Sequence, residues 1–288
     1  MRGWAGLLCA LLALGAAPAW AKPPIWVAHG PEATVVLFGS VHILPDKLDW
    51  EPQALTDALK DADELWFETP IDAGGLLEGA RLALAKGVLP DGETLSALLT
   101  PAQRERLKAT AADLGLPMAQ LDRLRPWLAE LSLAQAAYAR EGAFADQGVE
   151  RQLAQSAPQA GRHAFETPAQ QIALFAGAAA ADQVASLMDT VRELREDPDA
   201  YRRLMRDWLS GDLKALDRDG VQPLRRASPA LFKALLTDRN AAWVETLRKR
   251  LAGRGKVVVV VGVGHLIGPG GVPQLLRGAG VRVDGPKP

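Results

Sequence analysis

The chain has 288 residues, of which 48% are hydrophobic and 23% are charged, and its formal net charge is −1 at pH 7. This composition excludes fibrous, low-complexity and largely disordered proteins. Because the charge is near zero and no long run of Lys or Arg occurs, we expect no nucleic-acid partner and no attraction to an anionic membrane surface. A chain of this length buries enough surface to fold without disulfides.

The first 21 residues have the pattern of a secretory signal peptide. Arg2 gives a positive start, residues 7–17 are apolar, and Ala-Trp-Ala at 19–21 is typical of a cleavage site before Lys22. An uncleaved anchor is the alternative, but the apolar run is shorter than the roughly 20 residues that cross a bilayer. The only cysteine, Cys9, lies in this segment. We therefore expect an exported, periplasmic or secreted protein without thiols and without stable membrane insertion after cleavage.

The first part of the mature chain predicts strands around one helix. Residues 25–28 and 34–38 are apolar strands separated by a turn, which predicts an N-terminal hairpin. Residues 51–62 have helical spacing, and residues 64–68 return to strand character. A strand, a helix and a strand of these lengths favour a parallel crossover unit.

The middle of the chain is mostly helical in pattern. Thr-Pro-Ala-Gln at 100–103 predicts a capped helix start, and Gly115 predicts its end. Residues 163–166 predict one buried strand between helices. The other predicted helices are 118–139, bent or broken near Pro126, then 147–155, 178–196, 199–209, and 229–251 with Ser228 as N-cap.

Residues 256–261 are a Lys followed by five valines, which is typical of a central strand covered on both faces. A Gly/Pro loop at 268–271, a short helix and a strand at 281–283 follow. The sequence thus predicts a single α/β domain over 22–288. We expect a mostly parallel central sheet, an N-terminal hairpin and a large helical insertion at about 75–160 and 168–252.

Two segments follow the same plan, a β-branched strand followed by Gly-x-x-His. One is residues 39–42 and the other is residues 262–265. Because loops at the carboxyl ends of parallel strands line a common crevice, we expect His42 and His265 to project into one cleft. We expect Gly39, Gly262 and Gly264 to let the backbone turn or approach a substrate closely.

Four motifs together resemble the TraB/GumN proteins, which are related to the TIKI metalloproteases and to erythromycin-esterase-like proteins. They occupy residues 37–42, 166–170, 239–243 and 261–266, in order along nearly all of the mature chain. The resemblance implies an α/β fold with a paired Gly-x-x-His site. For the TIKI branch it also implies metal-dependent peptide hydrolysis.

Glu68 ends the second core strand and is the candidate third ligand of a divalent metal held by His42 and His265. Its alternative role is an ordinary cap at a strand end. Three nitrogen and oxygen ligands suit Zn²⁺ or Mn²⁺ without separating them. The resemblance to the TIKI proteins favours Mn²⁺ or Co²⁺.

Other residues are candidates for supporting roles. Glu166 follows the third predicted strand and is a candidate general base or a support for an imidazole. Arg239 could clamp a carboxylate or stabilise an oxyanion, a role that the resemblance favours over a solvated arginine. Asn240 is a neighbouring donor, whereas Trp243 is expected in the core. Gln170 is a weaker substrate-binding candidate, because a capping box already explains it.

Several sites are excluded or assigned to structure. Ile267 stands where a dinucleotide fingerprint needs its third Gly, so we expect no nucleotide cofactor. No Gly-x-Ser-x-Gly or His-Glu-x-x-His motif occurs. We expect His29 and His163 to be structural. Asp146 and Glu150 flank a helix start, where acids favour the helix dipole without a catalytic role.

The sequence therefore predicts an exported hydrolase, with metal-dependent peptide hydrolysis at catalytic residues His42, Glu68, Glu166, Arg239 and His265. Its substrate is expected to be a peptide or a small molecule. Two alternatives remain open. One is a periplasmic protein that binds a peptide or signal without turnover, and the other is a metal-free, esterase-like hydrolase in which one histidine is the base.

Overall fold

The computed structural model describes residues 22–287, so the predicted signal peptide lies outside the described residues. The protein is mixed α/β with a six-stranded, mainly parallel sheet, as predicted. The strands, in spatial order, are β6 (Gly161–Ala164), β4 (Glu64–Phe67), β7 (Arg254–Gly262), β2 (Glu32–Ser40), β1 (Ile25–His29) and β8 (Arg282–Asp284). The first four are parallel, and β1 is antiparallel to β2 and β8. A separate short pair joins β3 (Leu44–Pro45) and β5 (Ala143–Phe144).

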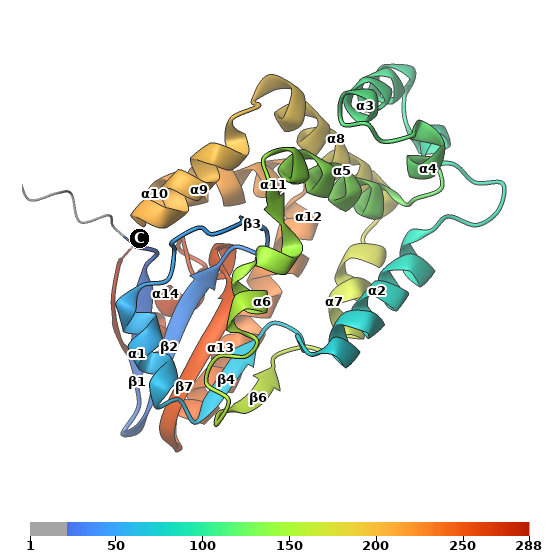
Figure 1. Ribbon diagram of the computed structural model, residues 1–288. Helices are drawn as coiled ribbons and strands as arrows, with labels where there is room; N and C mark the ends of the chain where they lie inside the picture. Colours follow the sequence, from blue (N-terminus) through green and yellow to red (C-terminus); the bar gives the residue numbers. More distant parts are fainter. Residues whose placement is uncertain (1–21, 288) are drawn as a thin grey trace, which may run out of the picture.

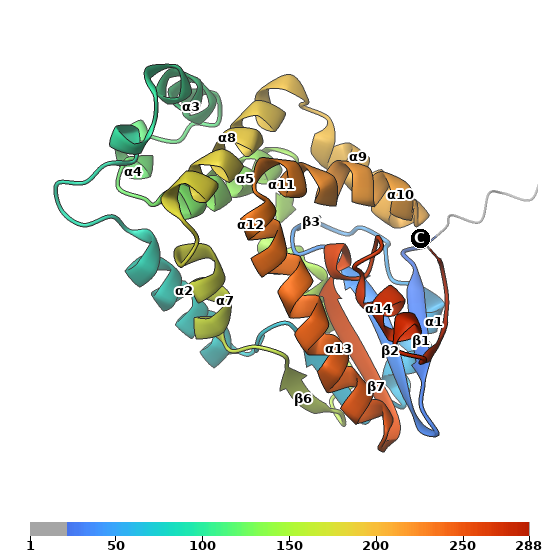
Figure 2. The same cartoon turned by 180° about the vertical axis from the view of Figure 1, so that it is seen from behind.

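Helices lie on both faces of the sheet and above the carboxyl ends of its parallel strands (Figures 1 and 2). Helices α13 and α14 cover one face, and α1 covers the other. The α-helices are α1 (Gln53–Lys60), α2 (Ala73–Gly87), α3 (Pro101–Asp113), α4 (Met118–Leu121), α5 (Pro126–Arg140), α6 (Val149–Leu153), α7 (Pro168–Ala176), α8 (Ala180–Glu196), α9 (Ala200–Ser210), α10 (Leu213–Leu216), α11 (Gln222–Ala227), α12 (Pro229–Phe232), α13 (Asp238–Leu251) and α14 (Val272–Gly278). Short 3₁₀ turns are η1 (Leu95–Leu98), η2 (Ala145–Gln147) and η5 (Val263–His265), and π turns are η3 (Asp217–Val221) and η4 (Lys233–Thr237).

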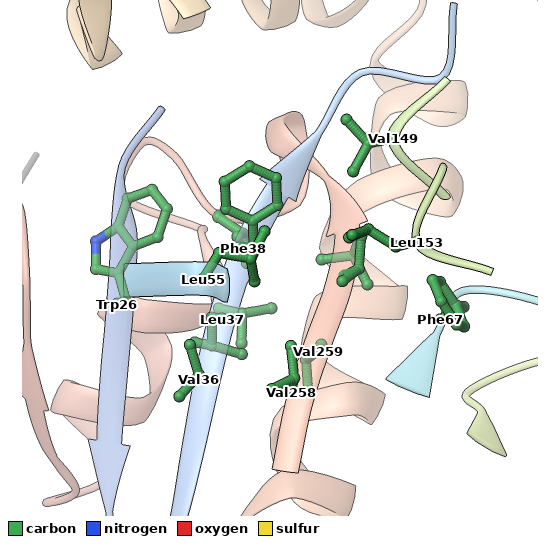
Figure 3. Close-up of a cluster of buried hydrophobic side chains, with 14 of the residues drawn as sticks. Trp26, Val36, Leu37, Phe38, Leu55, Phe67, Val149, Leu153, Val258 and Val259 are labelled. Carbon is green, nitrogen blue, oxygen red and sulfur yellow. The ribbon is translucent and has the colours of Figure 1, made fainter. Parts of the chain in front are cut away.

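The main apolar core lies around the two central strands, β2 and β7. All five valines of residues 257–261 are buried, which is the environment that an unbroken β-branched run predicts. Figure 3 shows Phe38 and Leu37 of β2 near Val258 and Val259 of β7, with side chains of the covering elements around them. Both Gly-x-x-His motifs lie at the carboxyl ends of these two packed strands.

A second apolar cluster lies among helices α3, α5 and α8, away from the sheet. Its fully buried members include Leu107, Leu133 and Leu187. The predicted capping box at Thr100 is confirmed, because Thr100 Oγ1 accepts a bond from the Gln103 backbone N–H and Gln103 Oε1 accepts one from the Thr100 backbone N–H. The predicted break near Pro126 is also confirmed, since α4 ends before it and α5 begins with it.

One sequence prediction about the sheet is wrong. Residues 163–166 were expected to form a buried strand, but β6 is an edge strand and its first three residues are exposed. His163 stacks on Trp66 of β4 at 5.0 Å between ring centroids. A short apolar pattern does not distinguish a covered strand from an edge strand. An edge strand that pairs with one neighbour and packs one face against the protein has the same pattern.

Within residues 22–287, no single helix is both long and apolar enough to cross a bilayer. Helices α7 and α8 satisfy the length and composition criteria only when taken together, and they meet at an angle of 90°.

Candidate functional site

Polar residues that follow the four parallel strands lie at one edge of the sheet. In the register of β2 and β7, Ser40 lies opposite Gly262, so His42 and His265 leave the sheet from adjacent strand ends. Glu68 follows β4 on the other side of β7. Glu166 follows β6, and its backbone N–H donates to the Glu68 carbonyl at 2.9 Å. The residues predicted from the strand ends therefore gather at a common edge.

Arg239 of α13 binds the two carboxylates of this site. Its Nη2 donates to Glu68 Oε2 at 2.6 Å, and its Nε donates to Glu166 Oε1 at 2.7 Å. Its Nη1 donates to the Leu235 carbonyl at 3.0 Å and lies 3.0 Å from His265 Nε2. The three charged side chains are only 9–12% exposed. Four of the five N–H groups of the guanidinium are therefore directed at groups of the protein.

His265 is held on both of its ring nitrogens. Nδ1 lies 2.5 Å from Asn240 Oδ1, and the Asn240 amide is oriented by a 2.8 Å bond from Nδ2 to the Gly270 carbonyl. Since Asn240 presents an oxygen and Arg239 presents an N–H, these partners assign the proton of neutral His265 to Nδ1. The ring also packs on Trp243 at 4.4 Å between centroids.

His42 is different, because its ring is open to solvent. Its side chain is 61% exposed, while Nδ1 lies 2.8 Å from Oε1 of Glu150, a carboxylate that is only 13% exposed. Ser40 Oγ donates to the same Glu150 oxygen. This arrangement orients the imidazole from one side and leaves the Nε2 side toward Gly262 and Glu68. His42 is the ionisable group of the site that an external molecule can reach.

The pKa values of the two histidines are shifted in opposite directions. Attraction to Glu150 is the main reason that the pKa of His42 is raised to about 9, so its ring is protonated at neutral pH. Burial is the main reason that the pKa of His265 is lowered to about 4, so its ring is neutral. Burial also disfavours the charged form of Glu68, but attraction to His265, His42 and Arg239 outweighs it and lowers the pKa of Glu68 to about 2.

Two of the three predicted glycines, Gly39 and Gly262, are needed for close packing. A Cβ on Gly262 would lie 3.2 Å from both Glu68 Oε1 and His42 Nε2, and a Cβ on Gly39 would lie 3.0 Å or less from atoms of Val263. Gly264 has room for a Cβ, since its nearest contact would be 3.6 Å. A side chain at Gly262 would fill the space between the Glu68 carboxylate and the exposed imidazole.

Gln170 caps the amino terminus of α7, as its capping-box motif predicts. Its Oε1 accepts from the Thr167 backbone at 2.8 Å, completing the capping box of α7. The next residue, Gln171, reaches the site instead, donating from Nε2 to Glu68 Oε2 at 3.3 Å. The sequence offered no signal that separated these two glutamines.

The predicted metal ligands do not fit a metal ion as they are arranged. Among residues 22–287, no group of three or more His, Asp or Glu side chains has the geometry of a metal site. The reason is visible in the contacts of Arg239, whose guanidinium lies against Glu68, Glu166 and His265. The guanidinium, a fixed cation, thus occupies the position between these donors.

Glu150 is the residue that the sequence reasoning missed. It was assigned to the helix dipole, but it lies buried beside His42 and Ser40. Its position in the first turn of α6 gave no local signal, because the contact spans 108 residues. Trp243 is in the core as expected, and its Nε1 also donates to Glu166 Oε1 at 3.0 Å. His29 pairs with Asp284 at the surface.

Fold and site together define an α/β protein with a histidine, carboxylate and arginine cluster at the carboxyl ends of its parallel strands. A sequence model of the TraB/PrgY/gumN family matches residues 24–285, and the chain belongs to this family. The resemblance seen in the sequence motifs is thereby confirmed.

Two bacterial relatives cover most of the chain. The uncharacterized protein YbaP of Escherichia coli (strain K12) is 26% identical over 242 residues, which is 84% of this chain and 87% of YbaP. An uncharacterized protein of Treponema pallidum (strain Nichols) is 23% identical over 285 residues, which is 93% of this chain and 85% of that protein.

Proposed function

We propose that the protein is a hydrolase of peptide bonds or related esters, in which the proton is carried by His42. The observation that carries the proposal is the exposed imidazole held at Nδ1 by the buried Glu150 carboxylate. A histidine oriented by a carboxylate on one nitrogen and open on the other is a common acid–base unit of hydrolases. The raised pKa of His42 favours the proton-donating form at neutral pH.

In the proposed reaction, water adds to the acyl carbon and the bond from that carbon to the leaving oxygen or nitrogen breaks. His42 Nε2 gives its proton to the leaving group, and the proton released by the attacking water restores the imidazolium. The products are a carboxylic acid and an alcohol or amine. Arg239 is a positioning residue in this scheme, because four of its five N–H groups are directed at Glu68, Glu166, Leu235 and His265 and its side chain is only 9% exposed.

The test is product formation by the mature protein, followed by mass spectrometry on a library of peptides and acyl esters. We expect His42→Gln to reduce kcat/KM by about 10²–10⁴-fold, the usual contribution of a general acid. His29→Gln is the matched control, since His29 also pairs with a carboxylate but lies at the surface. Unchanged turnover in His42→Gln contradicts the proposal, and binding without any product supports the binding-protein alternative.

Metal dependence is tested in the same assay. Because Arg239 lies among the candidate ligands, we expect turnover to persist after treatment with a chelator and elemental analysis to find no stoichiometric Mn, Co or Zn. A stoichiometric metal whose removal abolishes turnover would restore the metal-dependent mechanism that the TIKI resemblance implies.

We also propose that the protein is exported to the periplasm. The proposal is supported by the signal-like pattern of residues 1–21, which lie outside the described residues. Amino-terminal sequencing of protein from the periplasmic fraction of a bacterial host should begin at Lys22. Recovery of the full-length chain in the cytoplasm alone would contradict export.

A further inference from the structure

A cavity lies among the helices above the carboxyl ends of the parallel strands, lined by residues of α5, α7, α8, α11 and α12 and of the π turn η4. Its volume is about 230 Å³, and a larger hollow of about 540 Å³ shares several of its residues, including Glu130 and Glu193. Figure 2 shows these helices above the strand ends. None of the histidine, carboxylate or arginine residues of the strand-end site lines the cavity, although Leu235, whose carbonyl accepts from Arg239, does.

The described lining of this cavity has acids but no Lys, Arg or His. Asp189 already pairs with Arg192 on its own helix. Glu130 accepts bonds at Oε1 from Ser186 at 2.9 Å and Thr190 at 3.0 Å, which are both neutral hydroxyls. Neither Glu130 nor Glu193 forms an ion pair within residues 22–287, although Arg192 and Arg203, which line the larger hollow, partly offset the effect of burial on Glu193. A buried carboxylate without a counter-ion is costly unless a cation reaches it.

Burial is the main cause of unusual proton affinity at both acids. It raises the pKa of Glu130 to about 6 and also raises the pKa of Glu193. A cation placed beside them would reverse this effect by stabilising the charged carboxylates.

The other residues that line the cavity are mostly apolar and could pack against the apolar part of a ligand. Trp127 and Phe175 stack at 5.8 Å between centroids, and leucines from four elements complete the apolar surface. Trp127 and Gln183 are each only 3% exposed. Their atoms Trp127 Nε1 and Gln183 Oε1 are buried without any hydrogen-bond partner in the described chain. Both residues line the cavity, and native interiors seldom leave such atoms without a partner.

We propose that this cavity binds a primary amine that carries an apolar side chain, of the kind found in a small aromatic amine or amino-acid amide. The ammonium lies against the carboxylates of Glu130 and Glu193, and the apolar side chain packs on Trp127 and Phe175. The inference does not rest on hydrolysis at His42, so either proposal can fail while the other holds.

The test uses phenylalaninamide as the probe and isothermal titration calorimetry on the full mature chain. We expect saturable binding, and we expect Glu130→Gln to weaken it by about tenfold or more, since a buried charged partner is lost. Glu245→Gln is the control, because Glu245 is an exposed acid of α13 that pairs at the surface with Arg248. N-acetyl-phenylalaninamide, which lacks the cation, should bind at least about tenfold more weakly than phenylalaninamide.

A second variant addresses the cavity without touching its carboxylates. Ala227→Phe places a ring in the cavity wall and should abolish binding, while circular dichroism confirms that both variants remain folded. Three results would each overturn the proposal: no binding to the wild type at millimolar probe, equal binding by the Glu130→Gln variant, or equal binding of the acetylated probe. Equal binding of both probes would identify a merely apolar void.

Discussion

Substitution of Arg239 by Met tests how the strand-end site is held together. The change keeps an apolar stem of similar length but removes the guanidinium, which leaves Glu68 and Glu166 buried without their shared cation. Removing one member of a buried ion pair costs about 3–5 kcal/mol. Because one cation here serves two carboxylates that are 11% and 12% exposed, we expect a loss of about 4–5 kcal/mol at pH 7.

The assay is urea unfolding at pH 7 and again at pH 4. Arg248→Met is the matched control, since Arg248 lies on the same helix but pairs with Glu245 at the surface and should cost less than about 1 kcal/mol. The lowered pKa of Glu68 means that its stabilising contribution is present above about 4.5 and is lost as pH falls toward about 2. The penalty of Arg239→Met should therefore shrink at pH 4.

Arg239→Ala adds a second readout. It leaves Glu68, Glu166 and His265 facing a space without a cation, and these three donors are of the kind that bind Mn²⁺ or Zn²⁺. Millimolar metal should raise the unfolding midpoint of Arg239→Ala and leave the wild type unchanged. The reasoning is refuted if Arg239→Met and Arg248→Met have equal stability, or if the metal stabilises the wild type as much as the variant.

Three further predictions concern single features of the site. Thr167→Ala removes the α7 cap and should cost about 1 kcal/mol in urea unfolding, whereas an unchanged midpoint would show that the cap is dispensable. Gly262→Ala adds a Cβ 3.2 Å from Glu68 Oε1 and His42 Nε2, so it should lower kcat/KM more than it lowers stability; an unaltered rate would place the substrate elsewhere. Because the pKa of buried His265 is lowered to about 4, its contribution to stability is present above about 6.5 and is lost as pH falls toward 4. His265→Gln should flatten that acid dependence in unfolding experiments, and a profile identical to that of the wild type would contradict the assignment.

The sheet was largely predictable because its signals are local. The valine run at residues 257–261 predicts a strand covered on both faces, and the capping boxes at Thr100 and Thr167 predict helix starts within a few residues. The convergence of His42 and His265 followed from one general property, that parallel strands place their carboxyl ends at the same edge. Each of these predictions depends on residues close together in the sequence or on sheet geometry.

The partners within the site were not predictable in the same way. Glu150 reaches His42 across 108 residues, and its local context is only that of an acidic residue near a helix start. Arg239 was identified through a family motif, but its role as the cation between Glu68 and Glu166 depends on where α13 crosses the sheet. Helix packing of this kind is set by tertiary contacts that no short pattern encodes.

The central claim is that a buried carboxylate makes His42 the proton carrier of the site. The most direct test is an NMR titration of the His42 imidazole in the wild type and in Glu150→Gln. The account predicts a pKa near 9 in the wild type and a fall toward 6.5 in the variant, because attraction to Glu150 is the main cause of the rise. An ordinary value near 6.5 in both proteins would contradict it.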